Sequence, residues 1–264
     1  MAIAGYLASI FIGISLGLIG GGGSILTVPV LVYLFHMDAI LATVYSLFIV
    51  GTTSVAGSFS YFKRGLVHIK AVVVFGIPST ISVFLTRAYI VPAIPQHVFS
   101  IGSFTLTKGI LLLLLFAVLM IFAAYGMIKK DKKASEETSQ IQSFNYPLML
   151  VVGTVVGILT GLVGAGGGFL IIPALVNFMG LPMKKAIGTS LVIIAINSLA
   201  GFLFSLSHII ILWAFILNIT GLAIIGILAG SYISTKIDGR KLKPAFGWFV
   251  LVMGIYIILK ETLL

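Results

Sequence analysis

The amino-acid sequence predicts an all-α integral membrane protein built from two inverted repeats, each a broken re-entrant helical hairpin plus three transmembrane helices. Three observations lead to this fold class. The 264 residues are 60% hydrophobic and only 8% charged, with a mean hydropathy of +1.25, whereas soluble domains contain about a quarter charged residues. A Gly-rich pattern occurs twice along the chain, and basic residues gather between some apolar stretches but not others.

Long apolar stretches account for most of the chain, and a soluble core could not bury so many of them. One hydrophilic stretch, Lys129–Glu137, leaves four apolar stretches on each side. The chain is therefore divided into a first membrane repeat (1–128), a charged cytoplasmic linker (129–145) and a second membrane repeat (146–264). The apolar stretches are Tyr6–Phe35, Ile40–Phe62, Ala71–Ile90, Gly109–Ile128, Pro147–Met179, Ala186–Leu206, Ile210–Ile233 and Ala245–Leu259.

The two halves align without a gap between Gly17–Gly57 and Gly161–Gly201, an offset of 144 positions (161 − 17). Sixteen of the 41 aligned positions are identical. Apolar segments match one another by chance, but rarely at Gly clusters, Pro and Ser together, so the alignment indicates an internal repeat. The identical pairs include Pro29/Pro173, Ser46/Ser190, Ser54/Ser198 and Gly57/Gly201.

The first apolar stretch of each half is too long for one straight helix across the membrane. Tyr6–Phe35 would extend about 45 Å, against a hydrocarbon core of about 30 Å. Gly20–Gly23 lie near its middle, where consecutive Gly residues strongly disfavour helix. We therefore expect two half-helices that meet at a Gly-rich break, and the same in Pro147–Met179. The alternative is one long helix that is kinked and tilted.

The distribution of Lys and Arg distinguishes these two arrangements. If both broken stretches are re-entrant hairpins and both termini lie outside, 13 basic residues fall inside and 3 (Arg87, Lys108 and Lys260) fall outside. If both stretches span the membrane, the clusters Lys129–Lys133 and Lys236–Lys243 fall on opposite sides. The positive-inside rule therefore favours the hairpins and an inverted repeat.

Each Gly-rich break is a candidate anion site. A break inside a membrane is tolerated only where it is buried in protein or lines a wet cavity. The helices expected to begin near Ser24 and Gly168 present free N–H groups and the positive end of the helix dipole, and Gly amides can form a concave anion nest. Two such starts would meet near the bilayer middle. The alternative is close helix packing on Gly without a ligand.

Hydroxyl and amide side chains near the breaks can donate to an anion without adding charge. The repeat-matched pair Ser46/Ser190 is the strongest side-chain candidate, followed by Asn197, although such residues also serve to hold helices together. The predicted substrate-binding set is Gly20, Gly21, Gly22, Gly23, Ser24, Thr27, Ser46, Gly164, Ala165, Gly166, Gly167, Gly168, Ser190 and Asn197.

The sequence argues against an enzyme. It has no Cys, no zinc-binding pattern and no phosphate-binding Lys loop, and we expect neither metal nor cofactor. The formal net charge of +10 is explained by loop orientation rather than by nucleic-acid binding. The acids are confined to loops and helix ends, so a coupling proton would travel on the anion or through a His. They are Asp38, Asp131, Glu136, Glu137, Asp238 and Glu261.

The pattern Gly-x-x-Gly-x-Gly-Gly followed by Pro, in Gly17–Pro29 and Gly161–Pro173, resembles the sulfite exporter TauE/SafE family. Gly188–Leu191 is similar to that family's Thr-Ser element, while Tyr45 replaces Thr in the first copy and so implies unequal half-sites. The resemblance implies a secondary transporter for sulfite, organosulfonate or a related small sulfur-containing anion in the bacterial inner membrane.

Two other functions are considered beside this one: an anion channel and a transporter of a small carboxylate. A membrane enzyme ranks below both, because no nucleophile–base pair or metal-ligand set is visible. The expected partners are a small anionic substrate, membrane lipid and a coupling proton or sodium ion, with no nucleic acid. The sequence does not fix the oligomeric state or the direction of transport.

Overall fold

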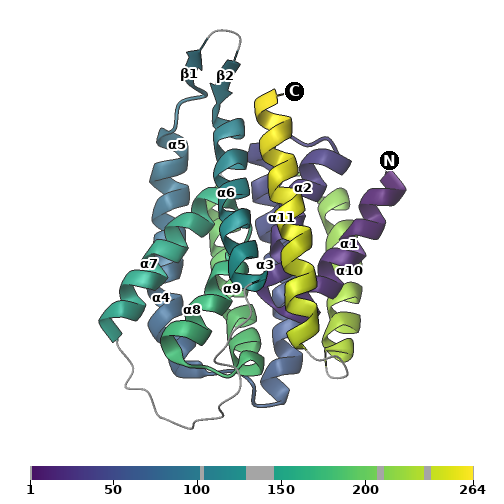
Figure 1. The fold of residues 1–264 in the computed structure, drawn as a ribbon, viewed down its shortest axis with the longest axis vertical. Coiled ribbons are helices and arrows are strands. Elements are labelled where there is room, and N and C mark those ends of the chain that lie inside the picture. Colours follow the sequence, from purple (N-terminus) through teal and green to yellow (C-terminus); the bar gives the residue numbers. More distant parts are fainter. Residues whose placement is uncertain (1, 102–103, 129–145, 207–210, 235–238, 264) are drawn as a thin grey trace.

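A computed structural model describes residues 2–101, 104–128, 146–206, 211–234 and 239–263, which are almost entirely helical (Figure 1). The predicted linker 129–145 lies outside the described residues. Five described helical segments are long and apolar enough to cross a membrane, so the prediction of a helical membrane protein is confirmed. These segments are Ala39–Lys63, Ile69–Ala93, Lys108–Gly126, Met183–Ser205 and Trp213–Ile233.

The helices follow one another in the same order in the two halves. The first half contains α1 (Ala2–Ile19), a 3-10 turn (Gly21–Gly23), α2 (Ser24–Pro29), a π-helical turn (Val30–Leu34), α3 (Ala39–Lys63), α4 (Ile69–Leu85), a second π-helical turn (Thr86–Ile90), α5 (Val91–Ala93) and α6 (Lys108–Ile128). The second contains α7 (Tyr146–Val163), α8 (Gly168–Met179), α9 (Met183–Ser205), α10 (Trp213–Ile233) and α11 (Gly239–Leu263).

The helix starts recur at the offset found in the sequence. The first residues of α1, α2, α3 and α4 lie 144 positions before those of α7, α8, α9 and α10 (for α1 and α7, 146 − 2). The two halves therefore use equivalent elements in the same order. The inverted relation between them, and the re-entrant path of the broken stretches, stay predictions.

Helices α3 and α9 pack against each other at the centre. Each is 67% buried over its most apolar part, against 39% to 44% for the other spanning segments. The flanking pairs are exchanged between the halves, since α1 packs on α10 and α7 packs on α4, while α6 packs on α11 (Figure 1). Neither half therefore forms a separate bundle.

Equivalent Gly residues allow the two exchanged pairs to approach closely. A Cβ added to Gly13 of α1 would collide with the carbonyl oxygen of Ala223, and a Cβ added to Gly157 of α7 would collide with that of Ser79. Gly157 lies 144 positions after Gly13, and Ala223 lies 144 positions after Ser79. The two interfaces thus bring the same backbone positions together, as expected where membrane helices pack on small residues.

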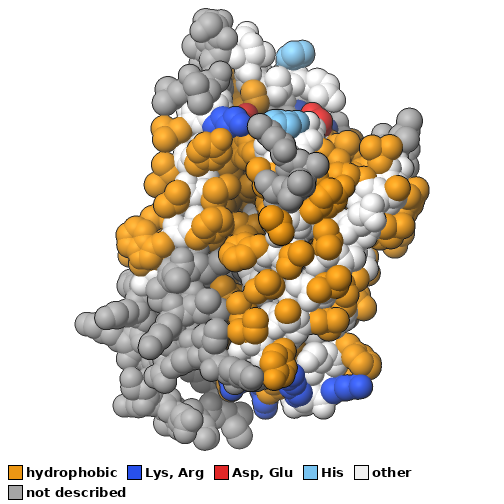
Figure 2. Space-filling model, turned by 90° about the vertical axis from the view of Figure 1, so that its right-hand side faces the viewer, with side chains coloured by type: hydrophobic (Ala, Val, Ile, Leu, Met, Phe, Trp, Pro, Cys, Tyr) orange, Lys and Arg blue, Asp and Glu red, His pale blue; other side chains and the backbone are white. Residues whose placement is uncertain are grey.

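The surface fits a lipid environment. Hydrophobic side chains cover most of the described part of the face in Figure 2, and Lys and Arg side chains gather at its lower end.

One element was not predicted. An antiparallel β-hairpin, β1 (His97–Ile101) paired with β2 (Phe104–Thr107), connects α5 to α6 at the upper end of the molecule (Figure 1). It lies between the predicted apolar stretches, which end at Ile90 and resume at Gly109.

Candidate functional site

The two glycine breaks meet at the centre of the molecule. A Cβ added to Gly21 would collide with the backbone of Gly168, and a Cβ added to Gly168 would collide with the Cα atom of Gly21. The starts of α2 and α8 are therefore in direct backbone contact, which no residue other than Gly would allow at these two positions.

The first break is compact. Gly20 has φ of +74°, a conformation that favours Gly, and its N–H donates to the carbonyl of Leu16 at 2.8 Å. The hydroxyl of Ser24 donates to the carbonyl of Gly21 at 2.7 Å. Helix α2 then continues for only 6 residues, all of them buried, to Pro29. Gly22 lies within the 3-10 turn of this break.

The second break contains three Gly residues in the left-handed conformation. Gly164, Gly166 and Gly167 have φ of +70°, +69° and +69°. The carbonyl of Gly167 accepts from Leu170 and Ile171 as α8 begins. In the described part of the chain, the N–H groups of Ala165, Gly166 and Gly167 find no backbone acceptor. These groups lie at the positive end of α8, a helix of 12 residues.

Buried hydroxyl groups without a hydrogen-bond partner lie on the elements that pack around the breaks. A Cβ added to Gly166 would lie 2.8 Å from the hydroxyl of Ser198, and one added to Gly20 would lie 3.3 Å from that of Ser190. Ser198 was not in the predicted set, although the repeat matched it with Ser54. The unpaired hydroxyls in this region are those of Thr27, Ser46, Thr53, Ser54, Thr160 and Ser198.

Two predicted side-chain ligands are already bonded within the protein. The hydroxyl of Ser190 donates to the carbonyl of Ile187 at 2.8 Å. The amide of Asn197 donates to Ser79 at 2.7 Å and accepts from Thr80 at 2.6 Å. Asn197 therefore connects α9 to α4, and its role as an anion ligand stays a prediction.

The substitution Asn197→Ala should lower stability more than anion affinity. It removes two hydrogen bonds, each worth about 0.5–1.5 kcal/mol net, and it leaves Ser79 to find a new partner, whereas the hydroxyl of Thr80 still reaches the carbonyl of Gly76 at 2.8 Å. We expect a lower thermal unfolding temperature in detergent and an affinity for sulfite that changes less than about threefold, or about 0.7 kcal/mol. A large loss of affinity with unchanged stability would instead identify Asn197 as a ligand.

The structure also encloses within the protein a cation that the sequence analysis assigned to the outer side of the membrane. Arg87, in the π-helical turn that continues α4, is only 5% exposed. Its Nη1 donates to the hydroxyl of Thr43 at 3.2 Å, and a Cβ on Gly164 would lie 2.5 Å from its Nη2. Lys108, the first residue of α6, is 7% exposed. An Arg at the end of an apolar stretch was the available signal, but such residues usually reach the interface.

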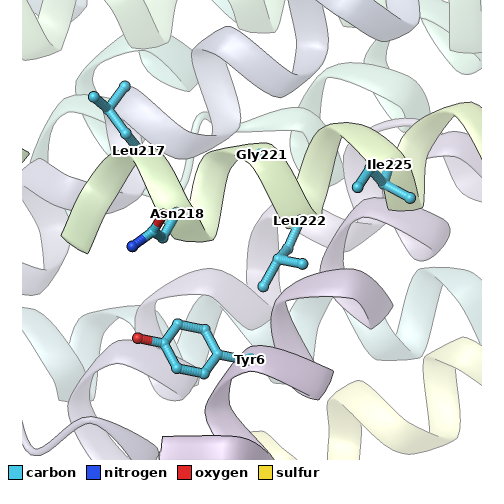
Figure 3. Close-up of a pocket in the computed structure, with 6 residues that line it drawn as sticks. All are labelled: Tyr6, Leu217, Asn218, Gly221, Leu222 and Ile225. Atoms are coloured by element: carbon cyan, nitrogen blue, oxygen red, sulfur yellow. The ribbon is translucent and has the colours of Figure 1, made fainter. Parts of the chain in front are cut away.

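Two hollows on the described part of the molecule lie away from the breaks. One, of about 410 Å³, lies between α1 and α10 and is lined by Tyr6, Leu217, Asn218, Gly221, Leu222 and Ile225 (Figure 3). The other, of about 350 Å³, lies on α4 and α9 and includes Gly76 and Thr80. The break residues Gly20, Gly21 and Gly164 to Gly168 are buried, so an anion could reach them only after a change in helix packing.

Comparisons with known proteins agree with this architecture. The family described as "Sulfite exporter TauE/SafE" matches residues 5–257. A probable membrane transporter protein of Xylella fastidiosa (strain 9a5c) is 30% identical over 252 residues, which cover 94% of this chain and 91% of that protein. The probable membrane transporter protein YunE of Bacillus subtilis (strain 168) is 29% identical over 259 residues, covering 92% and 89%. No solved structure matches the chain.

Proposed function

Because the chain belongs to the sulfite exporter TauE/SafE family, we propose that this membrane transporter moves sulfite, an organosulfonate or a related small sulfur-containing anion across the bacterial inner membrane. The names of the relatives support the transporter class. The family description supports a sulfur oxyanion as the substrate, and a small carboxylate is an alternative oxyanion of similar size.

The observation that carries the proposal is the contact between the two breaks, with free N–H groups on the α8 side. A buried anion is strongly unfavourable unless hydrogen bonds replace its water. Ala165, Gly166 and Gly167 offer N–H groups, and Ser46 and Ser198 offer unpaired hydroxyls. The positive end of α8 adds partial charge without an ionised side chain. These groups could hold a small oxyanion between the halves.

Transport by alternating access would follow from the exchanged packing. The α1–α10 and α7–α4 pairs are equivalent units, each with one helix from either half, and both flank the central α3–α9 pair. We propose that the halves are inverted repeats and that movement of these units opens the breaks to one side at a time. A proton or sodium ion would drive the movement, and a proton could travel on the anion itself.

The proposed orientation places both termini outside and the linker 129–145 in the cytoplasm. The gathering of Lys and Arg at the lower end in Figure 2 supports this orientation through the positive-inside rule. Single Cys residues introduced into the Cys-free chain can be labelled from one side of the membrane at a time. A Cys in the linker should react only from the cytoplasmic side, and labelling from outside would refute the orientation.

Reconstitution into liposomes tests the function. We expect uptake of labelled sulfite or sulfoacetate that saturates with concentration and accelerates when unlabelled anion is present inside. An anion channel would give uptake without this acceleration. Equal or better transport of acetate than of sulfite would assign the protein to small carboxylates.

The substitution Ser198→Ala should lower anion affinity about 10- to 100-fold, because a hydrogen bond to a charged group is worth about 1.5–3 kcal/mol. The matched control is Ser58→Ala, whose hydroxyl bonds to Val55 on an exposed part of α3. Isothermal titration calorimetry measures the sulfite affinity of both variants. Equal affinities for the two variants would exclude Ser198 from the site.

A further inference from the structure

Arg87 presents an unused hydrogen-bonding edge in the interior of the protein. Its Nη1 is held by Thr43, whereas its Nε and Nη2 are buried and have no partner. Nε and Nη2 lie on the same edge of the guanidinium, the fork that binds two oxygens of a carboxylate or a similar oxyanion. The bond to Thr43 fixes the plane of the group, so the fork is oriented before any ligand arrives.

A buried cation without a counter-charge is strongly unfavourable. No carboxylate of the described residues pairs with Arg87. Of the acids that are described, Asp38 accepts from the first N–H groups of α3 and Glu261 accepts from Tyr33. The described acids therefore leave Arg87 without a carboxylate partner.

The surroundings of the fork increase the attraction for an anion. Lys108 is also buried and lies within electrostatic range of Arg87. The hydroxyl of Thr86, next to Arg87, is buried without a partner. Gly164 borders the fork, and any side chain there would contact Nη2. The fork thus has a second cation within electrostatic range and a Gly residue directly beside its Nη2.

The two halves differ at this point. The repeat places Ser231 at the position equivalent to Arg87 (87 + 144), and Ser231 is buried with an unpaired hydroxyl. The cation is therefore present once, on the side where α4 ends and α6 begins beneath the β-hairpin in Figure 1. This asymmetry gives one end of the molecule a stronger attraction for anions than the equivalent position in the other half.

We infer that Arg87 and Lys108 form a second anion site, which borders the second break at Gly164, for an oxyanion that presents two oxygens to the guanidinium edge. The inference rests on the proposed function for the identity of the ligand, a sulfite, sulfonate or carboxylate on its way to or from the breaks. The same chemistry would fit a lipid phosphate. A different role for Arg87 would be to offset the partial negative charge at the C-terminal end of α7.

The test combines stability with the number of anions bound. Wild-type protein in lipid-free detergent is titrated with sulfite by calorimetry, beside Arg87→Met, Arg87→Lys and the control Arg64→Met, an exposed cation at the end of α3. We expect wild type and Arg64→Met to bind two anions per chain. Arg87→Met should bind one and unfold at a higher temperature than wild type without anion. Arg87→Lys should keep the site with an affinity lowered about 10-fold, since a point charge replaces the fork.

Several outcomes would overturn the inference. If Arg87→Met unfolds at a lower temperature and binds as many anions as wild type, the role of Arg87 is to offset the partial negative charge at the C-terminal end of α7. If anionic phospholipid displaces sulfite only from the wild-type site that Arg87→Met lacks, the ligand is a lipid headgroup. If Arg87→Met does not fold, Lys108→Met and Thr43→Val replace it in the titration. Each should weaken sulfite binding at one of the two sites, and unchanged binding at both sites would refute the inference. Wild type that binds no anion would refute the proposed function itself, whereas two sites in Arg87→Met would refute only this inference.

Discussion

Replacing Gly166 by Val should abolish anion binding and reduce transport to the background of empty liposomes. Gly166 has φ of +69°, which costs a residue with a side chain about 1–2 kcal/mol. A Cβ there would also lie 2.7 Å from Cγ1 of Val50 and 2.8 Å from the hydroxyl of Ser198. The turn would have to change shape, and the direction of its N–H groups would change with it.

The matched control is Gly221→Val on α10, an exposed position where an added Cβ meets nothing within 4 Å. Both variants should be compared as folded, monodisperse protein by sulfite titration and by liposome uptake. Sulfite affinity that survives Gly166→Val would show that this cluster only packs helices. The same loss is expected for Gly22→Val from the sequence repeat.

The second large effect is expected at the exchanged helix pairs. Gly13→Leu should separate α1 from α10, because its side chain would meet the backbone of Ala223 rather than a movable side chain. Overpacking typically lowers stability by about 1–3 kcal/mol. We expect a loss near the upper end of this range, because backbone cannot move aside as a side chain can. Gly157→Leu should do the same to the α7–α4 pair, where the backbone of Ser79 is the obstacle.

Thermal unfolding and size-exclusion profiles measure this effect, with Gly126→Leu as control because an added Cβ meets nothing within 4 Å there. We expect Gly13→Leu and Gly157→Leu to unfold at similarly reduced temperatures and Gly126→Leu to behave as wild type. Clearly different losses at Gly13 and Gly157 would contradict the equivalence of the two interfaces.

The breaks could be predicted from the sequence because their cause is local. Consecutive Gly residues disfavour helix wherever they occur, and the repeat showed that the feature occurs twice. The structure places breaks at Gly20 and at Gly164 to Gly167, and it puts Gly21 against Gly168. Helix starts were predictable for the same reason, since Asp38 is a favourable cap and lies directly before α3.

The remaining features depend on which helix covers which residue. From the sequence, Arg87 at the end of an apolar stretch is expected at the membrane interface. Only its contacts with Thr43 and Gly164 in the folded protein show that it is enclosed. Ser198 and Asn197 are neighbours on α9, yet one hydroxyl is free while the amide is bonded to α4. The pairing of α1 with α10 is likewise decided by tertiary packing, because periodicity along one helix does not identify its partner.

The exchanged pairing has a consequence for biosynthesis. Helix α1 leaves the ribosome about two hundred residues before its packing partner α10, and α6 likewise precedes its partner α11 by more than one hundred residues. The helices of the first half must therefore stay in the membrane with unpaired packing faces, among them the Gly-lined face of α1, until the second half is inserted. Two separately expressed halves should consequently be degraded alone and protected when they are made together, since each supplies the surface that shields the other from membrane proteases.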